Sequence, residues 1–288
     1  MSIDVVLTQK GIFKKPMPLE VILGKELAYG KMEGFRLIRG QLGETEFLAY
    51  HPEHIARGFS VIWSPEEKER IQLRALMPSA EAELRDFYDA VDRMVSYWNG
   101  RLEVDGAPMN ADQFQAGFSE MVSFQQRALE DMCRNILAGK NGDLTLFSAR
   151  WPLVVGKEEA YRFLEEPETF GQWLHEKQSI DAYYAAPLFF NGPVGILGRY
   201  VLTEEVRSIF PTQPSVPFGA IDPKTNQKPV CNDFAIALYS TTRGTVIGEI
   251  PYDRLLQKIP PEKVSQFDGG TVLLEPLSLS EMEALLDN

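Results

Sequence analysis

Residues 59–100 read FSVIWSPEEKERIQLRALMPSAEAELRDFYDAVDRMVSYWNG, and this stretch decides the fold class. Large apolar side chains occupy alternate positions from Phe59 to Trp63, which indicates a half-buried strand, and residues 71–77 form a second β-rich run. The polar residues 65–69 supply a turn between the two runs. From Pro78 to Gly100 the apolar residues instead recur every three or four positions, as on one face of a helix. The stretch therefore predicts an antiparallel hairpin followed by an amphipathic helix.

The rest of the chain extends this pattern in both directions. We predict further strands at residues 3–8, 35–39, 46–50, 101–104, 144–149, 183–190, 194–203, 234–240, 245–250 and 271–275. We predict further helices at residues 110–138, 157–164, 167–177, 251–258 and 279–286. Strands thus come in hairpins and helices in clusters, without strict β-α alternation. This order predicts an α+β fold of mainly antiparallel sheets covered by helices.

Two lobes of similar size are predicted, with a boundary in the polar, glycine-containing segment 139–142. The N-terminal α+β lobe would span residues 1–138 and the C-terminal α+β lobe residues 143–288. The order hairpin, proline, helix occurs in both halves, at residues 59–100 and again at 234–258. A duplication would explain the repeated order, but hairpins followed by helices are also common without one, and both explanations stay open.

The distribution of charge limits the partners. The net charge is −12, and residues 1–77 carry 11 Lys/Arg against 10 Asp/Glu, which leaves 18 against 31 for the rest. Binding of a phosphate backbone requires clustered Lys and Arg, so we expect no nucleic-acid partner. The acidity favours a basic protein as partner, although acidic surfaces also serve solubility alone.

Polar residues interrupt the first 13 positions, so no secretory signal is expected. No apolar run approaches the roughly 20 residues of a membrane helix, and we expect no membrane partner. The two cysteines, Cys133 and Cys231, lie far apart and are expected to be reduced thiols, which favours a cytoplasmic location. Oligomeric state is left open by the sequence.

Candidate chemistry is sparse. The sequence His51-Pro52-Glu53-His54 resembles a metal-binding pair, but its spacing does not put both rings on one helical face, and no metal is expected there. Neither a phosphate-binding glycine-rich loop nor a dinucleotide fingerprint occurs, and we expect no cofactor.

The C-terminal half offers the remaining candidates for a ligand site or an interface. It is rich in aromatic residues, and Tyr183 and Tyr184 are singled out because adjacent strand residues point to opposite faces, so that one must leave the core. His175, Cys231 and Asp233 complete the set. Burial as a small core residue is the simpler explanation for Cys231, and no catalytic residue is assigned.

Several segments resemble one known family. They are residues 13–18 (FKKPMP), Arg57-Gly58-Phe59 with the hairpin and helix that follow, residues 178–184 (QSIDAYY), and residues 200–206 (YVLTEEV) through 216–219 (VPFG). The chain resembles the bacterial domain of unknown function 4299 family, uncharacterised cytoplasmic proteins of Gram-positive bacteria. The resemblance runs along most of the chain and implies one co-inherited unit, but it brings no known activity, substrate, cofactor or catalytic residue.

Two functions therefore stay in competition, and the sequence does not decide whether the chain is an enzyme. The first is a non-enzymatic interaction protein with an acidic surface, such as an inhibitor or immunity-type partner of a basic protein. The second is a small-molecule-binding protein or enzyme with a site in the C-terminal half, beside the proline-rich segment 211–229. Within that segment we expect Phe218 to be buried and residues 223–227 to be exposed.

Overall fold

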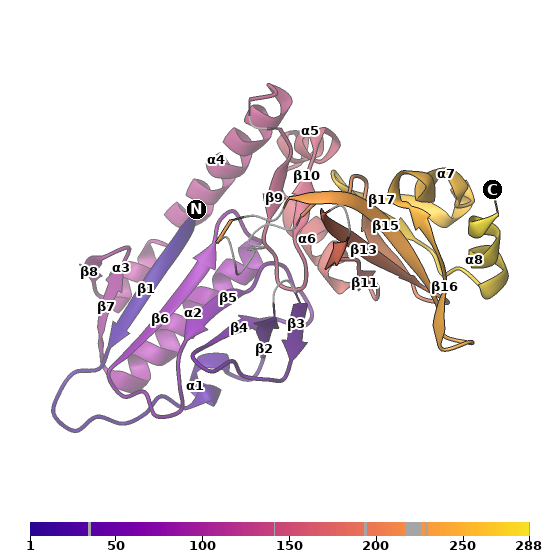
Figure 1. Ribbon diagram of the computed structural model, residues 1–288. Coiled ribbons are helices and arrows are strands. Elements are labelled where there is room, and N and C mark those ends of the chain that lie inside the picture. The colour runs from indigo at the N-terminus through magenta and orange to yellow at the C-terminus, as the bar shows by residue number, and fades with distance from the viewer. Residues whose placement is uncertain (34–35, 141, 193–194, 217–225, 228–229, 288) are drawn as a thin grey trace. The chain divides into compact units, whose positions relative to one another are not determined.

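The structure is a computed structural model that describes residues 1–33, 36–140, 142–192, 195–216, 226–227 and 230–287. The chain folds into two compact units, Met1–Ile180 and Asp181–Asn288 (Figure 1). This division falls later than the predicted boundary at residues 139–142, because the helix after that boundary packs against the helix before it. The earlier boundary stays a prediction about which lobes fold independently.

The N-terminal unit is built on one antiparallel sheet. Within the described residues, the sheet has eight strands in the order β3-β2-β4-β5-β6-β1-β7-β8. The strands are β1 (Ser2–Thr8), β2 (Ala28–Glu33), β3 (Arg36–Arg39), β4 (Glu46–Tyr50), β5 (Phe59–Ile62), β6 (Arg70–Leu76), β7 (Arg101–Val104) and β8 (Ala107–Met109). The hairpin predicted from residues 59–77 is confirmed as β5 and β6.

Helix α2 (Glu81–Trp98) packs on this sheet and creates the core of the unit. Its apolar stripe buries Leu84, Phe87 and Tyr88, and the alternation in β5 turns Phe59 toward the helix, where its ring meets Phe87 edge to face. The predicted amphipathic helix is thus confirmed. Figure 1 shows α2 running along one face of the strands.

The predicted helix over residues 110–138 is divided in two at Gly117. At its start Asn110 and Gln113 cap each other reciprocally, as the residue types at these two positions indicate in the sequence. The elements that complete the unit are α1 (Leu19–Leu23), α3 (Ala111–Ala116), α4 (Phe118–Leu137), β9 (Leu144–Leu146), β10 (Leu153–Val155), α5 (Lys157–Glu165) and α6 (Thr169–Ser179).

The C-terminal unit has two four-stranded sheets within the described residues, in the orders β11-β14-β18-β17 and β12-β13-β15-β16. The elements are β11 (Tyr183–Tyr184), β12 (Leu188–Gly192), β13 (Gly195–Thr203), β14 (Ser208–Pro211), β15 (Cys231–Ser240), β16 (Thr245–Pro251), η1 (Tyr252–Arg254), α7 (Leu255–Lys258), η2 (Pro261–Lys263), β17 (Val264–Asp268), β18 (Thr271–Leu274) and α8 (Leu279–Leu286). One hydrophobic core joins side chains from both sheets with α7 and α8. The unit therefore has a core of its own.

Two features of this unit differ from the prediction. The strand expected over residues 183–190 is two strands, because β11 pairs with β14 while β12 pairs with β13. The two predicted hairpins are confirmed, but β13 and β15 also pair side by side in parallel, which joins the hairpins into one sheet. The fold is α+β with mostly antiparallel sheets, as predicted.

Glu204 holds the turn between β15 and β16 through hydrogen bonds, and these bonds make the stability of the fold depend on pH. Its carboxylate accepts hydrogen bonds from the Ser240 hydroxyl (2.6 Å) and from the hydroxyl (2.6 Å) and backbone N–H (3.0 Å) of Thr242. These donors lower the pKa of Glu204 from its ordinary 4.5 to about 2. A depressed carboxyl pKa stabilises the fold above the unfolded pKa, and that contribution is lost as the pH falls from about 4.5 toward 2.

We therefore expect the thermal midpoint of the wild type to fall more steeply between about pH 5 and pH 3 than that of Glu204→Gln. The matched control is Glu205→Gln, since Glu205 is the exposed neighbour. Differential scanning calorimetry across this pH range measures the effect. Parallel curves for wild type and Glu204→Gln would show that these hydrogen bonds do not depend on the charge.

Candidate functional site

The three histidines of the chain all lie in or next to the segment between β4 and β5. The rings of His51 and His54 stack with centroids 3.8 Å apart, and Nε2 of His54 lies 2.6 Å from Oδ2 of Asp86 on α2. Nδ1 of His175, on α6, lies 3.3 Å from the carbonyl oxygen of Ile55. Within the described part of the chain, no three His, Cys, Asp or Glu side chains are arranged to hold a metal ion.

A buried ionic network lies next to these histidines. The Glu83 carboxylate accepts hydrogen bonds from the backbone N–H groups of Arg57 (3.0 Å) and Gly58, and from the Ser79 hydroxyl. The Arg57 guanidinium donates to the carbonyl oxygens of Pro78 and Phe147, both at 2.7 Å. The network joins the start of α2 to the 51–58 segment, and both its charged groups are buried.

Burial dominates the electrostatics of this region. It raises the pKa of Glu83, against the hydrogen bonds from Ser79, Gly58 and Arg57. It lowers the pKa of Arg57 to about 10, which leaves the guanidinium protonated at neutral pH. Burial also raises the pKa of Asp86, although the hydrogen bond from His54 opposes the shift. A histidine beside a carboxylate can accept a proton, but His54 bonds to Asp86, while the Ser79 hydroxyl of this region donates to Glu83.

The predicted tyrosines lie in the short strand β11 of the C-terminal unit. Tyr183 is 43 % exposed, whereas Tyr184 is partly buried, as expected for neighbours on opposite faces of a strand. Burial, the charge of Asp268 and the neighbouring Tyr200 together raise the pKa of Tyr184.

Cys231 and Asp233 lie close together at the start of β15. The Cys231 thiol donates to the carbonyl oxygen of Asp233 at 3.1 Å, and Asp233 forms an ion pair with Arg199 at 3.6 Å. Cys231 is only half-buried, while Cys133 on α4 is fully buried, and both are free thiols. The simple explanation of Cys231 as a fully buried core residue is therefore too strong.

Tyr200 is the functional candidate that sequence reasoning placed only within a general aromatic group. Burial raises the pKa of Tyr200, and the nearby Cys231 adds to that rise. Tyr200 in turn contributes to the raised pKa of Tyr184. Its hydroxyl also bonds the backbone N–H and carbonyl of Ser215, at the start of the proline-rich segment. The signal in the sequence was weak, because the pairing of β13 with β15 that places Tyr200 there joins strands about 30 residues apart.

The five candidates do not all belong to one unit. His175 lies in the N-terminal unit, and the other four lie in the C-terminal unit. Phe218 and residues 223–225 lie outside the described residues, so the prediction for the proline-rich segment is testable only at Asn226 and Gln227, which are exposed.

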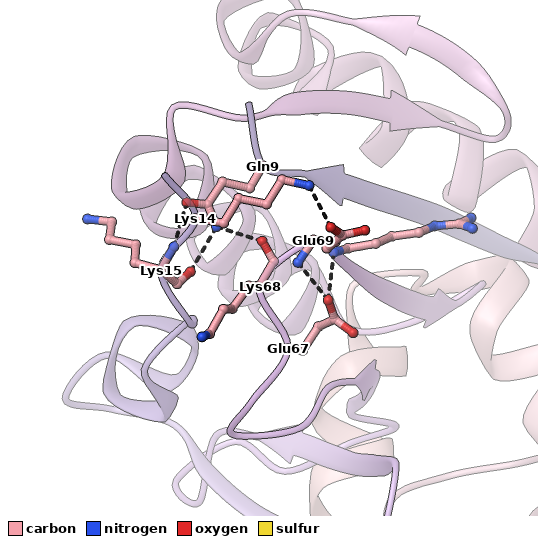
Figure 2. Close-up of polar contacts among 7 residues, drawn as sticks. Gln9, Lys14, Lys15, Glu67, Lys68 and Glu69 are labelled. Carbon is pink, nitrogen blue, oxygen red and sulfur yellow. Dashed lines mark hydrogen bonds and ion pairs between the residues drawn. The ribbon is translucent and has the colours of Figure 1, made fainter. Parts of the chain in front are cut away.

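A second surface feature was not singled out by sequence reasoning. After β1 the chain leaves the sheet as a long loop, and Gln9 holds the two ends of that loop together (Figures 1 and 2). The Gln9 amide donates to the carbonyl oxygens of Lys15 (2.8 Å) and Lys68 (2.7 Å) and accepts from the Lys15 N–H at 3.0 Å. The indole of Trp98 donates to the same Lys15 carbonyl.

The fold is that of an α+β protein of two compact units. The polar groups of the candidate sites described above mainly hold loops in place. The chain belongs to a particular family: the model described as Domain of unknown function (DUF4299) matches residues 2–285. The match spans both units, which confirms the resemblance along the whole chain. Neither the curated proteins nor the solved structures gave a significant match. In the described residues no helix is long and apolar enough to cross a membrane.

Proposed function

We propose that this chain is a non-enzymatic interaction protein, an inhibitor or immunity-type partner that binds a basic protein through its acidic surface. The main support for this proposal is the turn between α5 and α6, where Glu165, Glu166 and Glu168 are all exposed within four residues. Carboxylates this close repel one another, and a cationic partner surface relieves that repulsion.

The wider charge distribution supports the same partner. Residues 78–288 carry 31 Asp/Glu against 18 Lys/Arg. The outer face of α2 adds exposed carboxylates at Glu81, Asp89 and Asp92. Such a surface accelerates encounter with a basic protein and disfavours acidic competitors. A cytoplasmic location in a Gram-positive bacterium is part of the proposal, supported by the two free cysteines.

The alternative, a small-molecule-binding protein or enzyme, is favoured by one observation. Tyr184, Tyr200 and Cys231 are neighbours in the C-terminal unit, beside the start of the proline-rich segment. However, the thiol of Cys231 donates to backbone carbonyl oxygens, which serves the strand more than it serves a reaction. We rank this function second.

Affinity capture from the native host, at low and at moderate salt, tests the interaction proposal. We expect one specific basic protein at low salt and weaker recovery at moderate salt. The triple variant Glu165→Gln/Glu166→Gln/Glu168→Gln should lower the affinity of the purified pair roughly tenfold. The matched control neutralises three exposed carboxylates of the balanced N-terminal segment, Glu44, Glu46 and Glu66.

The control variant should bind like the wild type. Equal weakening by both triple variants would mean that only net charge matters, and the assignment of the α5–α6 turn would be wrong. If no specific partner is recovered at either salt concentration, the interaction proposal fails.

A further inference from the structure

The loop that follows β1 exposes two large apolar side chains at its end. Ile12 is 89 % exposed and Phe13 is 91 % exposed, so neither packs against the protein. Scattered exposed apolar residues are common, but two adjacent ones on a projecting loop form an unpartnered apolar tip. We call residues 10–15 the Lys10–Lys15 loop.

Hydrogen bonds tie the base of this loop to the fold, whereas the side chains at its tip are exposed. Gln9 is only 6 % exposed, and its three hydrogen bonds tie the chain at Lys15 to the chain at Lys68 (Figure 2). The ring of Tyr97 lies 3.6 Å from the Lys15 ammonium and adds a further contact at the base. Ordering the stem in advance lowers the entropic cost of presenting the tip to a binding partner.

Positive charge surrounds the tip, in a chain whose net charge is −12. Lys10 and Lys14 flank the apolar pair in sequence, and Lys15 follows. The Lys14 ammonium lies 2.8 Å from the Glu69 carboxylate, at the base of the loop (Figure 2). Across the loop base, segments 10–15 and 66–70 together carry five Lys/Arg (Lys10, Lys14, Lys15, Lys68, Arg70) and three Glu (Glu66, Glu67, Glu69).

We propose that the Lys10–Lys15 loop docks on the surface of an anionic lipid bilayer. Ile12 and Phe13 would enter the boundary between headgroups and acyl chains, while the lysines behind them meet the lipid phosphates. A bilayer surface complements this arrangement, because the outermost apolar side chains reach the acyl chains while the cations behind them stay at the level of the phosphates. The expectation of no membrane partner rested on the lack of a spanning segment, and docking at a surface needs none.

The acidity of the rest of the chain does not oppose this contact at physiological salt. Charges separated by more than about 8 Å are largely screened there, so the charge next to the loop decides the interaction. The excess of carboxylates lies after residue 77, outside the loop and its base. The same excess disfavours approach of other faces to an anionic surface, and therefore orients the chain with this loop toward the lipid.

Sedimentation of the full-length chain with lipid vesicles tests the proposal. The probes are vesicles of phosphatidylcholine with about 30 % phosphatidylglycerol, and vesicles of phosphatidylcholine alone, in about 0.1 M salt. We expect binding to the anionic vesicles and little to the neutral ones. The double variant Ile12→Ser/Phe13→Ser should weaken binding roughly tenfold or more. Lys10→Gln should weaken it about fivefold.

Two controls distinguish binding through the loop from nonspecific hydrophobic binding and from the effects of misfolding. Leu188→Ser/Phe190→Ser removes an apolar pair that is 56 % and 52 % exposed on β12, and it should bind like the wild type. Because the substituted apolar side chains are exposed, circular dichroism should show unchanged thermal midpoints for both double variants.

Phe13→Trp gives an independent readout: the difference between its emission and that of the wild type, which has the same four other tryptophans, should shift to the blue only when anionic vesicles are added. Absence of binding to anionic vesicles overturns the proposal. So does equal binding to neutral vesicles, or wild-type binding by Ile12→Ser/Phe13→Ser.

Discussion

Replacing Glu83 by glutamine is expected to destabilise the N-terminal unit by about 2–3 kcal/mol, because it leaves a buried hydrogen-bond donor without an acceptor. The carboxylate accepts from the N–H groups of Arg57 and Gly58 and from the Ser79 hydroxyl. An amide keeps one oxygen acceptor and turns the other position into a donor, which would face another donor. It also removes the carboxyl group whose charge favours the protonated form of the buried Arg57 guanidinium.

Urea unfolding followed by tryptophan fluorescence measures this loss. All four tryptophans, Trp63, Trp98, Trp151 and Trp173, lie in the N-terminal unit, so the signal reports that unit alone. The control is Glu81→Gln, an exposed carboxylate in the same first turn of α2, which should change the free energy of unfolding by less than about 0.5 kcal/mol. A loss below about 1 kcal/mol for Glu83→Gln would show that these buried hydrogen bonds contribute little to stability.

The parts of the fold that could be predicted are those in which apolar residues recur with a short-range period. The alternation of Phe59, Val61 and Trp63 and the helical spacing from Leu84 to Trp98 each fix which side chains face the core, whatever lies opposite. Reciprocal capping of Asn110 and Gln113 is also a local signal, and it was found. Hairpins and amphipathic helices were therefore recovered with nearly correct bounds.

The parts that could not be predicted depend on pairing between distant segments. The parallel pairing of β13 with β15 brings together residues about 36 positions apart, such as Tyr200 and Ile236, and no local pattern encodes it. Strands β2, β8, β10, β14 and β17 were missed for a related reason, since each gains its structure by pairing with neighbours in its sheet. The division of one predicted helix at Gly117 reflects tertiary packing on both sides of a residue that tolerates the change in direction.

The candidate sites show the same limit. His51 and His54 were considered as a pair in the sequence and His175 apart from them, and the structure brings all three to one segment through the packing of α2 and α6. Glu83 was not singled out in the sequence, because its burial depends on Arg57 and Gly58, which reach it from the connection between β4 and β5. The apolar tip at Ile12 and Phe13 carried a readable signal, two large apolar residues between lysines, that was not used.

A fragment of residues 1–180 is expected to fold with a tryptophan-monitored transition close to that of the full chain, whereas a fragment of residues 1–138 should be destabilised by roughly 5 kcal/mol or more. The shorter fragment removes α5, against which α4 packs. Leu129, Cys133 and Ile136 on α4 would then lose cover from a helix that buries Phe163. The cut also removes the Phe147 carbonyl that accepts from Arg57, and the Ala149 N–H that donates to Ala56.

Urea unfolding of the two purified fragments, monitored by circular dichroism as well as fluorescence, distinguishes the two possible boundaries. Residues 181–288 serve as the matched control, because that fragment keeps a core formed by both of its sheets and should fold on its own in either case. Equal stability of fragments 1–138 and 1–180 would place the boundary at residues 139–142, as the sequence predicts. Loss of cooperative unfolding in the shorter fragment alone would place it after Ile180, because α4 then depends on α5 for its burial.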